Sequence, residues 1–296
     1  MNFKEFDMAQ IHFNRIYVIE SLQDGETLTG TDLHKDLLQY QSIMHPDFQS
    51  VLFAPKNKTE WYQLFDQIKL DCRRNGISPI LHFEVHGSMA HDGLVLNSGD
   101  LITWENLYQN LVPINIAIKN ELFVTMAVCH GLFSMSSSFI NRTAAFRGII
   151  GSFEEIKTQD LVIRYFAFYE ELFRSFDLNE AYQKLQESNP TLPSSYKCYS
   201  AEEIFALTYT EYLKNDCSEE NLLKRAKSIS SELSSLRTRR ERRRWERDFI
   251  KKENKMREVY FKQAYETFFM LDKYPDLRDS IGLECDMSKL KEWLTR

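Results

Sequence analysis

Short apolar runs alternate with amphipathic stretches along roughly the first two thirds of the chain. Runs rich in β-branched and aromatic residues predict strands, and they cover residues 15–22, 78–87, 122–128 and 146–151. Apolar residues at helical spacing predict helices over residues 58–74, 101–111, 161–173 and 178–187, and another helix beginning within residues 137–143. Strands separated by helices are typical of β-α-β units. We therefore predict an α/β fold whose parallel-rich central sheet has helices on both faces.

The pattern changes near Tyr196, where the strand signal ends and helical periodicity takes over. Residues 201–214 predict one amphipathic helix, and further helical sequence follows it. We therefore predict a first domain over residues 1–195 and an α-helical extension over residues 196–296.

The helical sequence after residue 214 continues to the neighbourhood of Pro275, which cannot extend a helix. Asp216 and Glu219 have the spacing of a capping box at its start. The segment is longer than an ordinary globular helix. It is therefore either one protruding helix or two helices broken near residues 234–235.

The composition indicates which class of protein this chain belongs to. The chain has 296 residues, of which 43% are hydrophobic, so it can bury a sizeable core. No run of about 18 apolar residues and no signal-peptide pattern is present, and we expect a cytoplasmic, soluble protein without a membrane contact. The cysteines lie far apart without a Cys-x-x-Cys pair, at positions 72, 129, 198, 217 and 285. This spacing predicts free thiols in a reducing compartment, with no metal site and no cofactor.

Charge is distributed unevenly. Residues 1–195 hold 15 Lys/Arg and 24 Asp/Glu, a net charge of −9, whereas residues 196–296 hold 22 and 19, a net charge of +3. The basic stretch at residues 237–257 resembles a nucleic-acid surface in its content of Lys and Arg. Acidic residues interleave with the basic ones, at Glu241, Glu246, Asp248, Glu253 and Glu258. We favour ion pairs along an exposed helix. Nucleic-acid binding and a docking surface for a regulator or substrate protein are the two alternatives, of equal weight.

Two predicted strands share one design at their carboxyl ends. The apolar run at residues 81–87 ends in His86 and Gly87, and the run at residues 122–128 delivers Cys129. In a parallel α/β sheet these strand ends form the ligand crevice, so an imidazole and a thiol would meet there. A nearby imidazole can accept a thiol proton and later protonate a leaving amine. The amides of Gly87 and Cys129 are then a candidate oxyanion hole.

This pair of motifs resembles the caspase-like cysteine peptidases of clan CD, most closely the CHAT branch. The resemblance begins with His-Gly and the strand and helix that follow it, at residues 86–96 and 101–107. It continues with Cys-x-Gly at residues 129–131 and a Gly-x-x-Gly-Ser strand at residues 144–153. It ends with the helices at residues 161–173 and 178–181. Together these stretches span about residues 78–187. Val128, where the family often has Ala, and His130 depart from its pattern.

The resemblance implies a thiol protease that hydrolyses protein substrates through an acyl-enzyme on Cys129, with His86 as general base and acid. Many CHAT peptidases are regulated effectors in bacterial defence, including antiviral defence, so a regulatory protein partner is implied as well. In caspase-like enzymes the segment after the next strand lines the specificity pocket. The matching residues here are Ser152, Glu154 and Glu155, and these carboxylates would favour a Lys or Arg side chain, unless they simply begin a solvated helix.

Other histidines near the two motifs have simpler interpretations. His82 shares a strand face with His86 but is expected to be a hydrogen-bonded core residue, while His91 and Asp92 are expected at the rim. His130 is expected to support the site or lie at the surface. The alternative for the whole chain is a catalytically silent caspase-fold module that acts through its basic helical extension. In either case the basic helix contains no nucleophile, and we expect it to govern activity rather than perform chemistry.

Overall fold

The computed structural model describes residues 12–235 and 238–290. The chain divides into two compact units. The first comprises Met1–Ser138 and Thr143–Ala201, and the second comprises Phe139–Arg142 and Glu202–Arg296. The second unit therefore includes four residues that interrupt the first in sequence.

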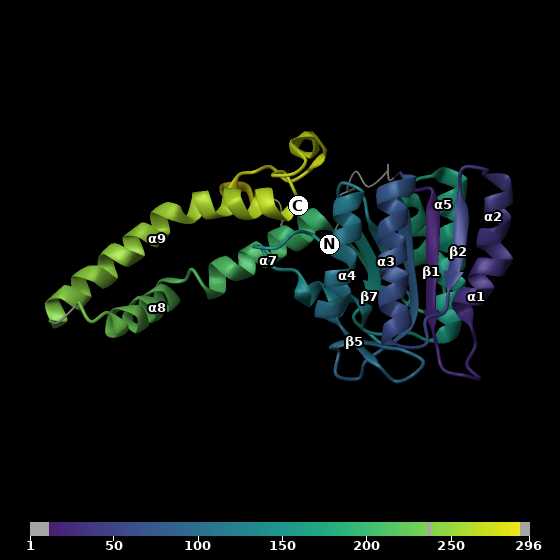
Figure 1. Cartoon of the computed structure of the whole chain (residues 1–296), viewed down its shortest axis with the longest axis horizontal. Coiled ribbons are helices and arrows are strands. Elements are labelled where there is room, and N and C mark those ends of the chain that lie inside the picture. Colours follow the sequence, from purple (N-terminus) through teal and green to yellow (C-terminus); the bar gives the residue numbers. More distant parts are fainter. Residues whose placement is uncertain (1–11, 236–237, 291–296) are drawn as a thin grey trace. The chain divides into compact units, whose positions relative to one another are not determined.

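In the part of the chain that the structure describes, eight strands form a mainly parallel sheet in the first unit (Figure 1). Six of them form its main path in the order β2-β1-β3-β6-β7-β8, where only β8 runs antiparallel to its neighbour. The short β4 and β5 extend the end of β3 as an antiparallel hairpin. The strands are β1 (Arg15–Ser21), β2 (Gln49–Phe53), β3 (Pro79–Gly87), β4 (Gly93–Val95), β5 (Leu101–Thr103), β6 (Phe123–Met126), β7 (Gly148–Ser152) and β8 (Tyr196–Ser200).

Helices cover both faces of this sheet (Figure 1). They are α1 (Thr29–Leu33), the π-helical η1 (His34–Leu38), α2 (Gln39–Met44), α3 (Lys58–Asn75), α4 (Trp104–Ala117), the 3-10 segment η2 (Gly131–Ser137), α5 (Thr158–Ser175) and α6 (Leu178–Glu187). The predicted α/β class with a parallel-rich sheet is confirmed, and this architecture is compatible with a caspase-like fold.

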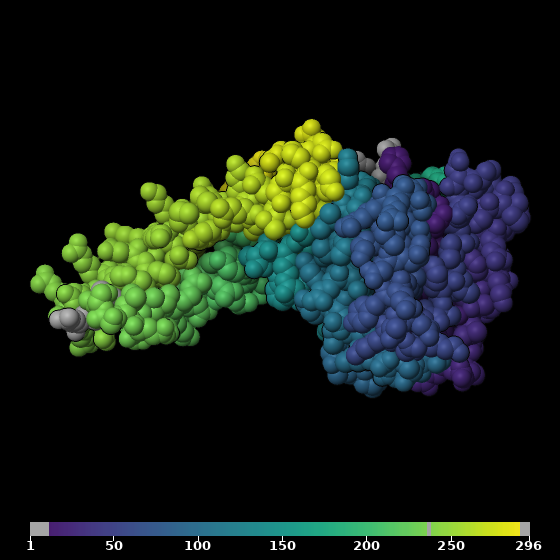
Figure 2. All heavy atoms as spheres, viewed as in Figure 1, coloured from purple at the N-terminus to yellow at the C-terminus, as the bar shows by residue number. Residues whose placement is uncertain are grey.

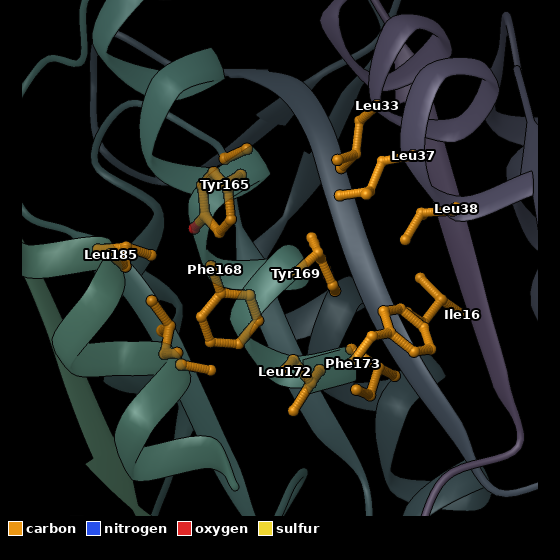
Figure 3. Packing of buried hydrophobic residues seen from close by; sticks show 14 of the residues in the cluster. Ile16, Leu33, Leu37, Leu38, Tyr165, Phe168, Tyr169, Leu172, Phe173 and Leu185 are labelled. Carbon is orange, nitrogen blue, oxygen red and sulfur yellow. The ribbon is translucent and has the colours of Figure 1, made fainter. Parts of the chain in front are cut away.

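The core on one sheet face is dominated by α5. Its Phe168, Tyr169 and Phe173 lie against Ile16 of β1 and the apolar side of α1 and η1 (Figure 3). On the other face Trp61 of α3 packs on Phe83 of β3, with ring centroids 6.0 Å apart. Burying each such side chain contributes about 1.5–3 kcal/mol. The sheet is thus fixed from both sides at the strands that carry the candidate chemistry.

Three details of the predicted elements in this unit are wrong. Residues 196–200 form β8, because Tyr196 and Ser200 are buried at an edge that pairs antiparallel with β7. The helix predicted over residues 101–111 begins only at Trp104, where the Thr103 side chain accepts a hydrogen bond from the Asn106 amide. No α-helix begins within the described residues 137–143, because the 3-10 segment η2 ends there instead.

The second unit is helical in its described residues. It contains α7 (Ala201–Asn215), α8 (Glu219–Glu232), α9 (Arg239–Phe268), and the 3-10 turns η3 (Pro275–Ser280) and η4 (Met287–Lys289). The break near residues 234–235 is confirmed. The capping box predicted at Asp216 is wrong, because Ser218 caps α8 and the capping box present is that of Thr238 and Glu241 on α9. Within the described ranges no helix is both long and apolar enough to cross a membrane.

Candidate active site

His86 and Cys129 occupy equivalent positions at the carboxyl ends of two neighbouring strands. β3 and β6 pair in parallel, and their last paired residues are Phe83 and Met126. His86 and Cys129 each lie three residues beyond this pair. Both are partly exposed, whereas the strand residues that precede them are buried. The topology therefore brings the two predicted residues to the same edge of the sheet.

Gly87 is in direct contact with the backbone of Cys129. A Cβ atom at position 87 would lie 1.8 Å from the Cys129 carbonyl oxygen and 2.9 Å from its carbonyl carbon. Real atoms cannot approach so closely, so only glycine fits at this position. The lack of a side chain at position 87 is what allows the end of β3 and the Cys129 turn to touch.

The His86 imidazole is oriented by a carboxylate that the sequence analysis did not single out. Its Nε2 lies 2.8 Å from Oε2 of Glu26. A carboxylate accepts, so Nε2–H donates, and in the neutral ring Nδ1 is left as the acceptor. The hydrogen bond from His86, reinforced by one from the Gln23 amide, lowers the pKa of the Glu26 carboxyl below its ordinary value. Glu26 is therefore ionised at neutral pH.

A tight turn after β1 presents Glu26 to His86. The Glu26 amide donates to the Gln23 carbonyl, and Gly25 between them has φ +92°. This is the signature of a turn that requires positive φ at its third residue. Asp24-Gly25 directly after a strand was the sequence signal for this turn, and β1 is the neighbour of β3 in the sheet.

Cys129 lies in a turn between β6 and η2. The Gly131 amide donates to the Val128 carbonyl, and His130 has the left-handed φ of 60°. The Cys129 Sγ receives a hydrogen bond from the Ile156 amide at 3.3 Å. No hydrogen bond joins the thiol to His86 in the part of the chain that the structure describes.

His130 is held by the segment that follows β7. Its amide donates to the Glu154 carbonyl at 3.1 Å, and its Nδ1–H donates to the Phe153 carbonyl at 2.8 Å. The His91 ring lies against it, with centroids 3.9 Å apart, and stacks in turn on Phe133. The position of the imidazole is thus fixed by backbone and ring contacts, and it supports the Cys129 turn.

The three residues predicted to line a specificity pocket lie at the end of β7 and directly after it. Ser152 is buried, donates to the Ser195 hydroxyl at 2.9 Å, and accepts from the Glu154 amide at 2.9 Å. The side chains of Glu154 and Glu155 are exposed. Glu154 contacts the Cys129 turn through its backbone carbonyl, which accepts from the His130 amide.

A buried polar network lies on the sheet face behind the site. His82 is fully buried, with Nδ1 2.7 Å from the Thr125 hydroxyl and Nε2 3.0 Å from Oε1 of Glu84. Thr125 also contacts the Tyr169 hydroxyl at 2.9 Å, and Thr29 donates to Glu84. His82 is therefore a satisfied core histidine, and burial raises the pKa of Tyr169 well above its ordinary value.

Glu20, at the end of β1, fixes the element that follows the Glu26 turn. Its carboxylate accepts from the amides of Gly30 and Thr31 and from the Thr31 hydroxyl, at 2.8, 3.0 and 2.6 Å. These bonds satisfy free amides at the start of α1. Because β1 and α1 are both anchored, the turn that carries Glu26 is held between two fixed points.

Neither the known protein-family models nor the curated protein sequences contain a match to this chain. Within residues 12–235 and 238–290, no group of three or more His, Cys, Asp or Glu side chains is arranged to hold a metal ion. All five cysteines are free thiols.

Proposed function

We propose that this chain is a cysteine peptidase of the caspase-like type, with Cys129 as nucleophile and His86 as general base and acid. The observation that carries the proposal is the placement of both residues three positions beyond the same strand pair, with Glu26 bonded to the far side of the imidazole. Its substrate class is protein, and a regulated role in bacterial defence follows from the resemblance to CHAT peptidases.

The proposed reaction uses only groups of the chain, the substrate and water. Nδ1 of His86 accepts the Cys129 proton, and the thiolate attacks the scissile carbonyl carbon. The amides of Gly87 and Cys129 stabilise the resulting oxyanion. His86 then gives its proton to the departing amine, which leaves an acyl-enzyme. Water, deprotonated by His86, hydrolyses the thioester and regenerates the thiol.

The backbone of Ile156 holds the Cys129 sulfur at the strand end, since its amide donates to Sγ at 3.3 Å and its carbonyl lies 3.8 Å from the same atom. Glu154 and Glu155 are the groups proposed to select a Lys or Arg side chain before the cleaved bond. A peptide library with each residue in turn at that position measures this preference, and a preference for Asp or for large apolar residues would contradict it.

A second candidate is a catalytically silent module with the same fold. The observation that favours it is the absence of a hydrogen bond between His86 and Cys129 among the described residues, where the thiol is bonded to Ile156 instead. In this alternative the chain acts through its surfaces.

Thiol labelling distinguishes the two candidates. In a peptidase, iodoacetamide labels Cys129 faster than the other four cysteines, and labelling slows when His86 is replaced by Ala. Cys129→Ala and His86→Ala both abolish peptide hydrolysis, because nucleophile and base act as a unit. Equal labelling of Cys129 in wild type and His86→Ala, together with unchanged hydrolysis in Cys129→Ala, would reject the peptidase.

A further inference from the structure

Helices α8 and α9 lie side by side within the second unit, and Figure 2 shows their atoms in contact. Two polar contacts tie them together. The Arg225 guanidinium pairs with Glu253 at 3.1 Å, and the Ser230 hydroxyl donates to Oε1 of Glu246 at 2.9 Å. Leu222 and Ala226 of α8 are buried beside these contacts.

Three of the five acidic residues that interleave with the arginines of α9 make structural contacts. Oε2 of Glu241 accepts from the Thr238 amide at 2.8 Å and completes the capping box. Glu246 and Glu253 are bonded to α8 as described above. Among the described residues, none of the ion pairs found joins these three acids to another residue of α9.

Four arginines of α9 line one groove of about 620 Å³. They are Arg239, Arg240, Arg243 and Arg247. Leu223 and Ile250 contribute apolar surface, and Glu246 is the single acid among the lining residues. All four arginine side chains are exposed, and no ion pair to any of them is found among the described residues. The groove therefore carries a concentrated positive charge in a chain whose net charge is −6.

Three of these arginines follow one another along one side of α9. Arg239, Arg243 and Arg247 are spaced by four residues, which places them on one side of α9 at intervals of about 6 Å. A nucleic-acid strand presents one phosphate per nucleotide at a comparable and regular interval. An acidic peptide offers carboxylates only where its sequence contains them. The planar guanidinium also matches phosphate oxygens with two parallel hydrogen bonds.

We propose that this arginine groove binds the phosphate backbone of a single-stranded nucleic acid. Phosphate contacts of this kind carry no base specificity, so binding depends on charge and not on sequence. The overall negative charge of the chain opposes the approach of a polyanion. Binding is therefore local to the groove and strongly weakened by salt. The proposal is independent of the peptidase reaction, and Cys129→Ala is expected to bind as wild type does.

Fluorescence anisotropy with a labelled oligouridylate of about 20 nucleotides tests the proposal on the full chain, in salt from about 50 to 200 mM. In a plot of the logarithm of the association constant against the logarithm of the salt concentration, the slope should be about −0.7 for each phosphate contacted. Four contacts therefore give a slope of about −3. The double variant Arg243→Ala/Arg247→Ala should bind at least about 10-fold more weakly, and its slope should be smaller by about 1.4.

The matched control is Arg174→Ala/Arg278→Ala, which removes the same charge from two exposed arginines that pair with acids elsewhere. It should bind as wild type does. The groove proposal is overturned if the Arg243→Ala/Arg247→Ala protein, with a wild-type circular dichroism spectrum, keeps the wild-type affinity and slope. It is equally overturned if polyglutamate of matched charge displaces the strand as well as unlabelled oligouridylate does, because the groove then recognises acidic polypeptide.

Discussion

Oε2 of Glu26 lies 2.8 Å from Nε2 of His86, although the two residues are 60 positions apart in the sequence. The contact forms because β1 and β3 are neighbours, so the turn that follows β1 lies beside the end of β3. It fixes which nitrogen of the imidazole carries a proton and directs the other nitrogen away from the carboxylate. In the proposed reaction this makes Glu26 a positioning residue for His86.

Glu26→Gln should therefore slow the chemistry without unfolding the protein. The amide keeps the size of the side chain but removes the negative charge beside His86. We expect about a 10-fold fall in kcat, less than the roughly 10²–10⁴-fold that a direct general acid or base contributes, because Glu26 acts only through His86. Both side chains are substantially exposed, at 39% for Glu26 and 43% for His86, so stability should change by less than about 1 kcal/mol.

Iodoacetamide labelling of Cys129 and hydrolysis of a peptide substrate both measure this change. Glu170→Gln, which removes one exposed carboxylate from α5, is the control of equal charge. If Glu26→Gln and Glu170→Gln label at the same rate, Glu26 has no positioning role.

The same pair predicts a pH dependence. The hydrogen bonds from His86 and Gln23 hold the pKa of Glu26 below its ordinary value of 4.5 in the folded protein. A depressed carboxyl pKa contributes stability that is fully present above the ordinary pKa and is lost as pH falls through the folded pKa. Wild type should therefore melt slightly above Glu26→Gln at neutral pH, and the two melting temperatures should converge as pH falls below 4.5 and through the folded pKa of Glu26. A difference in melting temperature that grows as the pH falls would contradict this prediction.

Much of the fold could be predicted, because its strands are apolar runs and its helices have clear periodicity. The candidate dyad could also be predicted, since His86 and Cys129 each follow such a run. Glu26 could not be assigned from the sequence, because its contact depends on which strands are neighbours. β8 was missed because Tyr-Lys-Cys-Tyr-Ser is short and is stabilised by pairing with β7 rather than by an apolar pattern.

The helix caps also include one feature that the sequence rule predicts correctly and one that it does not. The spacing of Asp216 and Glu219 suggested a capping box that the structure does not use, while Thr238 and Glu241 have the same spacing and form one. Both pairs satisfy the sequence rule, and only the position of the chain break decides between them. The buried partners of Glu20 and Glu84 could likewise not be predicted, because Glu side chains usually face solvent.

Gly87→Ala should displace the Cys129 turn. The added Cβ would lie 1.8 Å from the Cys129 carbonyl oxygen, so one of the two strand ends has to move. Overpacking of this kind costs about 1–3 kcal/mol, and we expect hydrolysis and rapid labelling of Cys129 to be lost together. Gly282→Ala is the control, because a Cβ there meets no atom within 4 Å. Wild-type labelling in Gly87→Ala would show that the contact is not needed for the site.

The last prediction concerns the buried network behind the site, in which Thr125 is the central group. Glu84, when ionised, can only accept, so Nε2–H of His82 donates to it and Nδ1 becomes an acceptor. The Thr125 hydroxyl then donates to Nδ1 and accepts from Tyr169. Every polar group in this chain of bonds is satisfied in one arrangement, and Nδ1 of His82 and the Tyr169 hydroxyl both depend on Thr125.

Thr125→Val keeps the shape of the side chain but leaves Nδ1 of His82 and the Tyr169 hydroxyl without their partner. A buried polar group left unsatisfied costs about 1–3 kcal/mol, so we expect a loss of about 2–4 kcal/mol in the free energy of unfolding. Thr125→Ser retains the hydroxyl and removes one methyl group, which should cost only about 1 kcal/mol. Urea denaturation at neutral pH measures both. If Thr125→Val loses no more than Thr125→Ser, the hydrogen-bonded chain contributes no more to stability than the packing of one methyl group, and the prediction is wrong. The double variant Tyr169→Phe/Thr125→Val adds a separate check. Both changes remove the same hydrogen bond, so the double variant should lose less stability than the sum of the losses in the two single variants.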